Sequence, residues 1–145
     1  MQREELVEKI AGDLEGKIQN TLRPSAKRLY LFVPPEHSLA VNRYLFENGG
    51  RLATATGVDS RDYIEVLYHY CFDTLNVVVT VRTNAYKPQV ELDSVASILP
   101  GAEWIEREIH DLLGVRFKNH PRLERLILSD DWPEGVYPYR RDYKP

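Results

Sequence analysis

The spacing of apolar residues divides the first third of the chain into alternating predicted elements. Apolar residues recur at every fourth position across residues 3–20, which predicts an amphipathic helix that Pro24 closes. The apolar run at 28–33 predicts a short strand. Residues 35–48 then predict a second helix, and Gly49-Gly50 ends it because glycine accepts the left-handed backbone of a helix C-cap.

The middle of the chain predicts strands. Residues 52–58, 63–72 and 75–83 are separated by short polar turns, and segment 63–72 places apolar and polar residues at alternate positions. Such period-two spacing is typical of an antiparallel sheet with one buried face. We expect residues 84–88 to form a loop and residues 93–99 to form a short helix.

The last third changes character at one residue. Residues 102–113 predict a charged helix with an apolar stripe, and Gly114 ends it. The predicted fold class is therefore α+β, with an antiparallel sheet of about four strands, helices packed on it, and an extended irregular arm. We expect one structural domain, in which residues 1–99 form the α+β part, 100–114 carry the helix and 115–145 form the arm.

Composition narrows the possible functions. The chain has 145 residues, of which 43% are hydrophobic and 28% are charged, as in an ordinary globular domain. Its net charge of -3 argues against nucleic acid as a partner, because phosphate binding needs a surplus of cations. No segment reaches the roughly 20 apolar residues of a membrane-spanning helix, and the start lacks a secretion signal. We therefore expect a cytosolic protein.

The single cysteine, Cys71, limits redox chemistry. One thiol forms no internal disulfide, and an iron–sulfur cluster generally needs four cysteine ligands. We interpret Cys71 as a small strand residue and expect this chain to bind no cofactor.

The charged residues of the helix at 102–113 allow two interpretations. Glu103, Arg107 and Asp111 are successive i, i+4 neighbours that could form a solvated ladder of weak ion pairs. Alternatively, Glu106, Arg107, Glu108 and Asp111 are partly buried at an interface and orient arginines of the arm by charge-assisted hydrogen bonds. The arginines available for that role are Arg125, Arg140 and Arg141.

A metal-dependent enzyme is the alternative function that we weigh against a binding role. Glu106 and His110 share a helical face, and His120 or His69 could complete a metal site. No His-Glu-x-x-His motif or cluster of Cys and His residues supports it.

A base-stacking platform for RNA is a further alternative. Tyr63, Tyr68 and Tyr70 lie on one predicted strand, and aromatic side chains on a sheet can stack with bases. The acidic balance and the position of the aromatic residues on the apolar face favour a core role instead.

The arm has the composition of an interface segment. It carries seven Lys and Arg residues against five acids. Pro121, Pro133 and Pro138 keep stretches of it extended and lower the entropy lost on docking. Its aromatic residues are of the types that anchor protein interfaces; these are Trp132, Tyr137, Tyr139 and Tyr143.

These residues also form a long discontinuous motif. It reads Glu106-Arg107-Glu108-x-x-Asp111-Leu112-Leu113-Gly114-x-x-Phe117-x-x-His120-Pro121-x-Leu123-x-Arg125, and the chain ends Pro138-Tyr139-Arg140-Arg141-Asp142-Tyr143. The motif resembles the 30 kDa subunit family, also called the C subunit family, of respiratory complex I, NADH:quinone oxidoreductase. That family has relatives in energy-converting NiFe hydrogenases. The segment 132–138 is more similar to the hydrogenase relatives than to the quinone-reducing enzymes.

The resemblance implies a structural role without chemistry in this chain. Such a subunit packs on the large catalytic subunit and on an iron–sulfur subunit, and those partners hold the iron–sulfur clusters and the quinone or NiFe centre. It implies peripheral attachment at the cytoplasmic side of the cytoplasmic membrane. The residues expected to bind partners are Trp104, Glu106, Arg107, Glu108, Asp111, Phe117, His120, Pro121, Arg125, Trp132, Tyr137, Arg140, Arg141, Asp142 and Tyr143.

Overall fold

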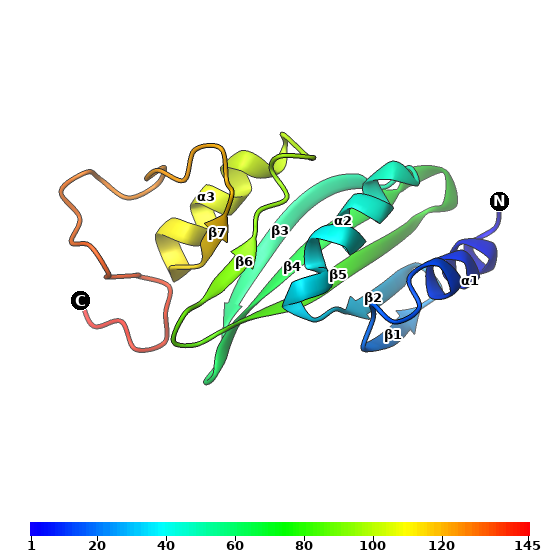
Figure 1. Cartoon of the computed structure of the whole chain (residues 1–145), viewed down its shortest axis with the longest axis horizontal. Helices are drawn as coiled ribbons and strands as arrows, with labels where there is room; N and C mark the ends of the chain where they lie inside the picture. Colours follow the sequence, from blue (N-terminus) through cyan, green and yellow to red (C-terminus); the bar gives the residue numbers. More distant parts are fainter.

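A computed structural model describes the whole chain, residues 1–145, as an α+β fold around a five-stranded mixed sheet (Figure 1). The strands lie in the order β1-β2-β5-β4-β3, and β6 pairs with β7 in a second, two-stranded sheet. The strands are β1 (Asn20–Ser25), β2 (Arg28–Phe32), β3 (Arg51–Asp59), β4 (Tyr63–Phe72), β5 (Val77–Tyr86), β6 (Glu91–Asp93) and β7 (Arg116–Lys118). The helices are α1 (Arg3–Asp13), α2 (Ser38–Glu47) and α3 (Ala102–Leu113), with 3₁₀ turns η1 (Pro35–His37) and η2 (Asp73–Leu75).

Strands β4 and β5 form the centre of the sheet. They pair antiparallel over their full length, from Tyr63 opposite Tyr86 to Phe72 opposite Val77. Every second residue of β4 is buried, as the alternating sequence predicts. These side chains and those of β5 form the core of the domain, because successive residues of a strand point to opposite faces.

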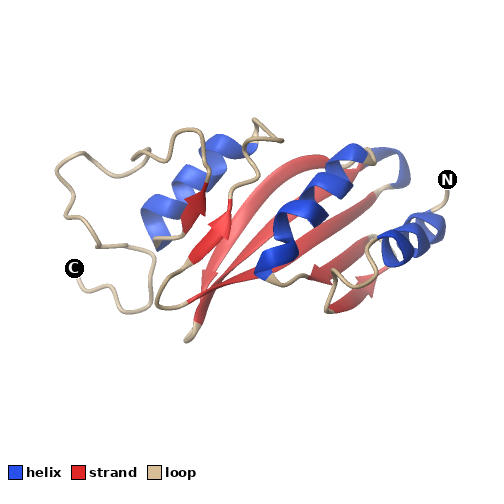
Figure 2. Cartoon of the chain, in the orientation of Figure 1, coloured by secondary structure: helices blue, strands red, loops and turns tan.

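The helices lie over one face of the sheet (Figure 2). Leu6 and Ile10 of α1 and Val41 and Leu45 of α2 join the core. Helix α3 packs against β3 at Gly57, where a Cβ atom would overlap the Leu113 side chain. The absence of a side chain at this position therefore sets how closely α3 approaches the sheet.

The first helix is shorter than predicted, and a strand follows it. The predicted helix over 3–20 ends at Asp13, and Gly16 takes a positive φ of 84°. Residues 20–25 form β1, which pairs antiparallel with β2. Glycine lowers helix propensity, so the helix stops near Gly12 and Gly16 although apolar residues continue to recur at every fourth position.

The sheet has five strands and is not wholly antiparallel. Strand β2 runs parallel to β5, because α2, β3 and β4 intervene between them along the chain. The predicted loop at 84–88 is wrong for residues 84–86, which continue β5 to pair with β4. The predicted helix at 93–99 is also wrong, because Glu91–Asp93 pairs with Arg116–Lys118 and turns follow.

The hypothesis that β4 forms a base-stacking platform for RNA is wrong. Tyr68 and Tyr70 are fully buried on the core face. Their hydroxyl groups donate hydrogen bonds to Glu106 and Asn42, respectively. Tyr63 lies on the opposite face, edge-on to Tyr86. The aromatic residues of β4 therefore stabilise the domain from within.

Replacing Gly57 with alanine should separate α3 from the sheet. We expect Gly57→Ala to lower the free energy of unfolding by about 1–3 kcal/mol, because the new methyl group overlaps Leu113. Gly12→Ala is the control, since nothing lies within 4 Å of a Cβ atom at Gly12, and it should stabilise α1 by about 0.5–1 kcal/mol. Urea unfolding measures both, and equal stability of the two variants would contradict the close approach.

Candidate functional site: the arm docked on helix α3

Glu106 anchors α3 inside the domain. Its side chain is fully buried. It accepts hydrogen bonds from the Tyr68 hydroxyl (2.7 Å), the Ser94 hydroxyl (2.6 Å) and the backbone N–H of Val95 (3.1 Å). Burial raises the pKa of the Glu106 carboxyl above its ordinary value, and these donors oppose part of that rise. Glu106 thus ties the helix to β4 and to the turn after β6.

His120 links the start of the arm to the same region. Its side chain is fully buried, and Nε2 lies 3.9 Å from Glu106 Oε1. Because Nδ1 accepts the backbone N–H of Arg122, the proton is on Nε2, which donates to the Glu103 carbonyl (3.0 Å). These two hydrogen bonds fix the direction of the chain after β7.

Arg107 binds the backbone of the arm. It is 6% exposed, and its guanidinium donates to the carbonyl oxygens of Glu124 (3.0 Å) and Arg125 (2.9 Å). The same group lies over the Trp104 ring, 5.4 Å from the ring centroid. One cation therefore satisfies two carbonyl groups of a segment that has no helix or strand of its own.

Asp111, one turn further along α3, binds the next residues of the arm. Its Oδ2 atom accepts the backbone N–H groups of Leu126 (2.7 Å), Ile127 (2.7 Å) and Leu128 (3.3 Å). Asp111 is 3% exposed, so these bonds are shielded from water. Charge-assisted bonds of this kind are about twice as strong as neutral ones.

The end of the arm returns to the C-terminal end of α3. The Tyr137 ring packs against Gly114, which takes a positive φ of 78° and leaves no room for a Cβ atom. Arg140 lies over that ring and donates from Nε to the Leu113 carbonyl (2.6 Å), and the N–H of Tyr139 donates to the Leu112 carbonyl (3.0 Å).

Asp59, at the end of β3, holds the final contact. Its Oδ2 atom accepts the backbone N–H of Arg141 (2.9 Å). Its Oδ1 atom lies 2.7 Å from Lys87 Nζ, so the two side chains form an ion pair. Burial by itself would raise the pKa of the Asp59 carboxyl, but this pair and the Arg141 N–H hold that pKa below its ordinary value.

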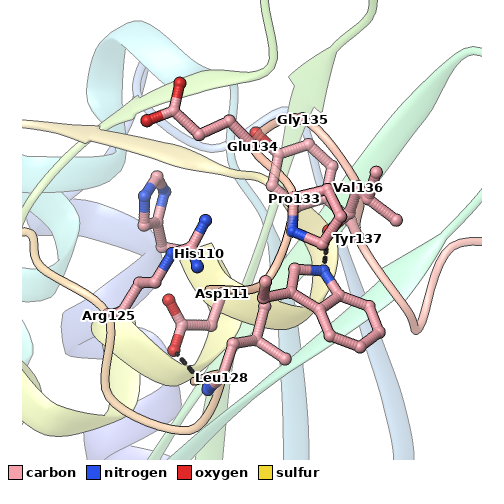
Figure 3. Close-up of a pocket in the computed structure, with 10 residues that line it drawn as sticks. His110, Asp111, Arg125, Leu128, Pro133, Glu134, Gly135, Val136 and Tyr137 are labelled. Carbon is pink, nitrogen blue, oxygen red and sulfur yellow. Dashed lines mark hydrogen bonds between the residues drawn. The ribbon is translucent and has the colours of Figure 1, made fainter. Parts of the chain in front are cut away.

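A cavity of about 320 Å³ lies between the arm and α3 (Figure 3). His110 and Asp111 of α3 form one side, and the arm forms the other. The Trp132 indole donates to the Val136 carbonyl (2.8 Å), and His110 Nδ1 donates to the Val115 carbonyl (2.8 Å). The polar groups beside the cavity therefore form hydrogen bonds that stabilise the conformation of the arm.

The structure separates the predicted partner-binding residues into three groups. One group points inward and shapes the arm: Glu106, Arg107, Asp111, Phe117, His120, Tyr137 and Arg140. Other members of the predicted set lie at the surface: Trp104, Glu108, Pro121, Arg141 and Asp142. Between them, Arg125, Trp132 and Tyr143 are half-buried. Trp132 and Tyr143 lie against each other, with ring centroids 6.2 Å apart.

Neither interpretation of the helix charges is fully correct. Glu103, Arg107 and Asp111 form no ion pairs with one another. Arg107 and Asp111 are buried and do orient the arm, but they bind its backbone rather than the arginine side chains. Sequence spacing places charges on a helix face, and the irregular path of the arm decides which atoms they meet.

The alternative metal site is not formed. No three His, Cys, Asp or Glu side chains lie together in a way that could hold a metal ion. Glu106 and His120 lie near each other, but Glu106 is bound by Ser94 and Tyr68, whereas His110 binds the Val115 carbonyl beyond the end of the helix. A shared helical face therefore did not produce a shared site.

Sequence reasoning missed residues that complete the site. Gly57 admits α3 to the sheet, Ser94 and Tyr68 bind Glu106, and Asp59 holds the end of the arm. No local pattern identifies the pairing of Asp59 with Arg141, because 82 residues separate them. A glycine inside a strand is the one available signal, since it often marks a close approach.

Two solved structures have the same fold as this chain. A chain of an archaeal respiratory membrane complex, the membrane-bound sulfane sulfur reductase, has the same fold, with a TM-score of 0.87 and 27% identity. The match covers 97% of this chain and 85% of that one. The Nqo5 fragment 1–134 has the same fold at 22% identity, with a TM-score of 0.68 over 83% of this chain and 98% of that one.

Comparison of sequences defines the family. Residues 31–145 match the family described as respiratory-chain NADH dehydrogenase, 30 Kd subunit. The chain belongs to this family, which supplies the C subunit of complex I-type oxidoreductases. The resemblance noted from the motif is thereby confirmed.

Individual relatives match over different lengths. The C subunit of F(420)H(2) dehydrogenase from Methanosarcina mazei is 32% identical over 96% of this chain and 90% of its own. The C subunit of NADH-quinone oxidoreductase from Streptomyces coelicolor is 28% identical over 94% of this chain and 61% of its own. The C/D subunit of NADH-quinone oxidoreductase from Phocaeicola vulgatus is 46% identical over 63% of this chain and 18% of its own.

No helix of this chain combines the length and apolar character needed to cross a bilayer.

Removing the Asp111 carboxylate should release the arm. We expect Asp111→Ala to raise amide hydrogen exchange of residues 124–128 by at least about tenfold, because three bonds to a charged acceptor are lost. Glu108→Ala, an exposed position of the same helix, should leave that exchange unchanged. Unaltered exchange in Asp111→Ala would show that another contact holds the arm.

Glu106 should give stability a distinct dependence on pH. Its pKa is raised on folding, so the folded state binds the proton more tightly and stability falls as pH rises from about 4.5 through the folded pKa. We expect Glu106→Gln to lose this negative slope, which reaches at most about 1.4 kcal/mol per pH unit. Urea unfolding between pH 4 and 8 tests this against Glu108→Gln, and parallel curves for wild type and Glu106→Gln would refute it.

Proposed function

We propose that this chain is a non-catalytic peripheral-arm subunit of a membrane-bound complex I-type oxidoreductase. In this role it clamps the large catalytic subunit and a neighbouring iron–sulfur subunit. One observation supports the proposal most directly: the backbone and the outward side chains of the arm have different partners. Buried charges of α3 bind the backbone of the arm, and this leaves its outward side chains free to contact another protein.

The surface of α3 and the arm has the residue types of a protein interface. Trp104 is 61% exposed, Tyr139 is 68% exposed and Ile127 is 57% exposed. Large side chains of this kind supply most of the binding energy when a partner buries them. The Arg141 and Asp142 side chains beside them are also exposed and would supply charge pairing at the rim.

A shaped arm lowers the free energy that docking requires. A flexible segment of this length would lose conformational entropy on binding, at a cost of about 1–2 kcal/mol for each residue fixed. The bonds from Arg107, Asp111 and Arg140 already restrict much of its path. The arm therefore offers a largely formed surface, which supports a clamp rather than a tether.

We propose that the redox groups belong to the partners. The iron–sulfur clusters and the quinone or NiFe centre would lie in the neighbouring subunits, and this chain would set their relative positions. Cys71 lies on β4 away from the arm and half-exposed, where a cluster ligand would need companions that the chain does not contain.

We further propose that the chain is held at the cytoplasmic side of the membrane through its partners. The parent complex is the finer question. The segment 132–138 favours an energy-converting NiFe hydrogenase, whereas the relatives described above are subunits of F(420)H(2) dehydrogenase and of NADH-quinone oxidoreductases. Purifying the native complex in mild detergent and identifying its large subunit by mass spectrometry decides between them. A large subunit with cysteine ligands for nickel and iron would establish the hydrogenase.

Outward side chains, rather than the buried charges, should control assembly. We expect Trp104→Ala combined with Arg141→Glu to lower co-purification of the large subunit at least about tenfold, while the melting temperature of the free chain stays within about 2 °C. Arg140 is kept because it binds the Leu113 carbonyl within the chain. The control is Lys27→Glu, an exposed position on the β1–β2 turn at the other end of the molecule (Figure 1). Normal assembly of the double variant would contradict the proposal.

A further inference from the structure

One edge of the main sheet has no partner strand. Strand β3 pairs with β4 alone, and the order of strands places it at the sheet boundary. No backbone group of residues 51–59 takes part in the hydrogen bonds between main-chain atoms outside the helices and strands. The outward N–H and C=O groups of this edge therefore have no main-chain partner, which makes the edge a template for an added strand.

The opposite edge of the sheet is guarded more fully than the β3 edge. Strand β1 contains Arg23 and Pro24 and shifts register between Leu22 and Ser25. Strand β3 carries no proline, and no charged residue lies between Arg51 and Asp59. Its register shift lies between Leu52 and Thr54, so pairing is regular from Thr54 to Asp59. Native sheets protect edges with prolines, charges and bulges, so an edge with fewer of them is expected to be covered.

Helix α3 provides a wall beside this edge. Ile109 and Leu113 contact the site of Gly57 on β3, which places the helix directly over the strand. At about 100° per residue, Ile105 and Glu108 lie on the flank away from Glu106, whose side chain binds Tyr68 and Ser94 on the interior side of the helix. Because β3 is the last strand of the sheet, that flank is on the side of the unpaired edge, and the exposed Trp104 adjoins it on the helix surface.

The arm reaches one end of this edge. The N–H of Tyr139 binds the Leu112 carbonyl, and the N–H of Arg141 binds Asp59 at the end of β3. The edge is therefore continuous with the surface of the arm described above. Thr54 and Thr56 are exposed on the sheet face opposite α3, and Glu108 on α3 is exposed without an ion-pair partner.

We propose that the free edge of β3 and the Trp104–Glu108 flank of α3 bind an extended segment of a partner subunit as a sixth strand. The segment would carry apolar side chains at alternate positions toward Ile105 and Trp104, and a lysine or arginine opposite Glu108. Main-chain hydrogen bonds supply the affinity in this mode, and the alternate side chains supply specificity. The inference rests on the proposed function, because it names one way in which the subunit meets its partner.

A second copy of this chain is the less suitable occupant. Two β3 strands paired antiparallel would bring both α3 helices to the same seam. Two Glu108 side chains would then approach each other, and like charges across an interface oppose binding. A partner segment with a cation at that place has no such penalty.

Hydrogen exchange on the assembled complex tests the added strand. Compared with the isolated chain, we expect amides of residues 53–58 to exchange at least about tenfold more slowly in the native complex. The comparison segment is 20–25, the guarded edge, which should exchange equally in both. Protection of the exposed side of the arm on assembly, read from peptides covering 129–143, reports separately on the proposed clamp.

The outcomes distinguish the two proposals. Protection of 129–143 without protection of 53–58 overturns the added strand and leaves the clamp standing. Protection of neither segment overturns both. Protection of 53–58 that appears in the isolated chain as its concentration rises shows a second copy on this edge and overturns a partner segment.

A charge reversal tests the chemistry of the partner segment. Glu108→Lys should reduce both protection of 53–58 and co-purification of the partner at least about fivefold, because a cation would face the segment's own cation. The matched control is Glu36→Lys, an exposed acid in η1, which should change neither. Unchanged protection in Glu108→Lys would overturn the assignment of a basic residue at that position.

Discussion

The docked arm depends on one interaction: two oppositely charged side chains of α3 satisfy the backbone of a segment that cannot satisfy itself. Arg107 donates to consecutive carbonyl groups, and Asp111 accepts consecutive N–H groups. Peptide groups outside a helix or strand need such partners when they are shielded from water. Without this pair, backbone groups of residues 124–128 would lose their partners on α3, and only apolar contacts such as that of Leu123 with the core would hold the segment there.

The same helix is tied to the sheet by a different chemistry. Glu106 receives donors from β4 and from the turn after β6, while Gly57 lets the apolar side of α3 come close to β3. One face of a twelve-residue helix thus binds the core, and another binds the arm. Because α3 is attached to both, it fixes the position of the arm relative to the sheet.

The geometry explains why the family motif contains these charged residues. Motif residues that suggested contact with a partner are mostly internal, because Glu106, Arg107 and Asp111 are almost completely buried. Their identity is demanded by hydrogen-bond geometry within the chain. Contact with other subunits is then left to side chains with fewer internal duties, such as Trp104 and Arg141, and to the unpaired edge of β3.

The sequence by itself determined the elements whose signal is local. The alternation at 63–72 identified β4, the apolar stripe and Gly114 identified α3, and the aromatic, proline-rich ending identified an irregular arm. Only the tertiary structure decided the parallel pairing of β2 with β5, the strand at Asn20–Ser25, and the partners of Arg107, Asp111 and Asp59. Those outcomes depend on contacts between distant residues, which residue spacing along a chain does not specify.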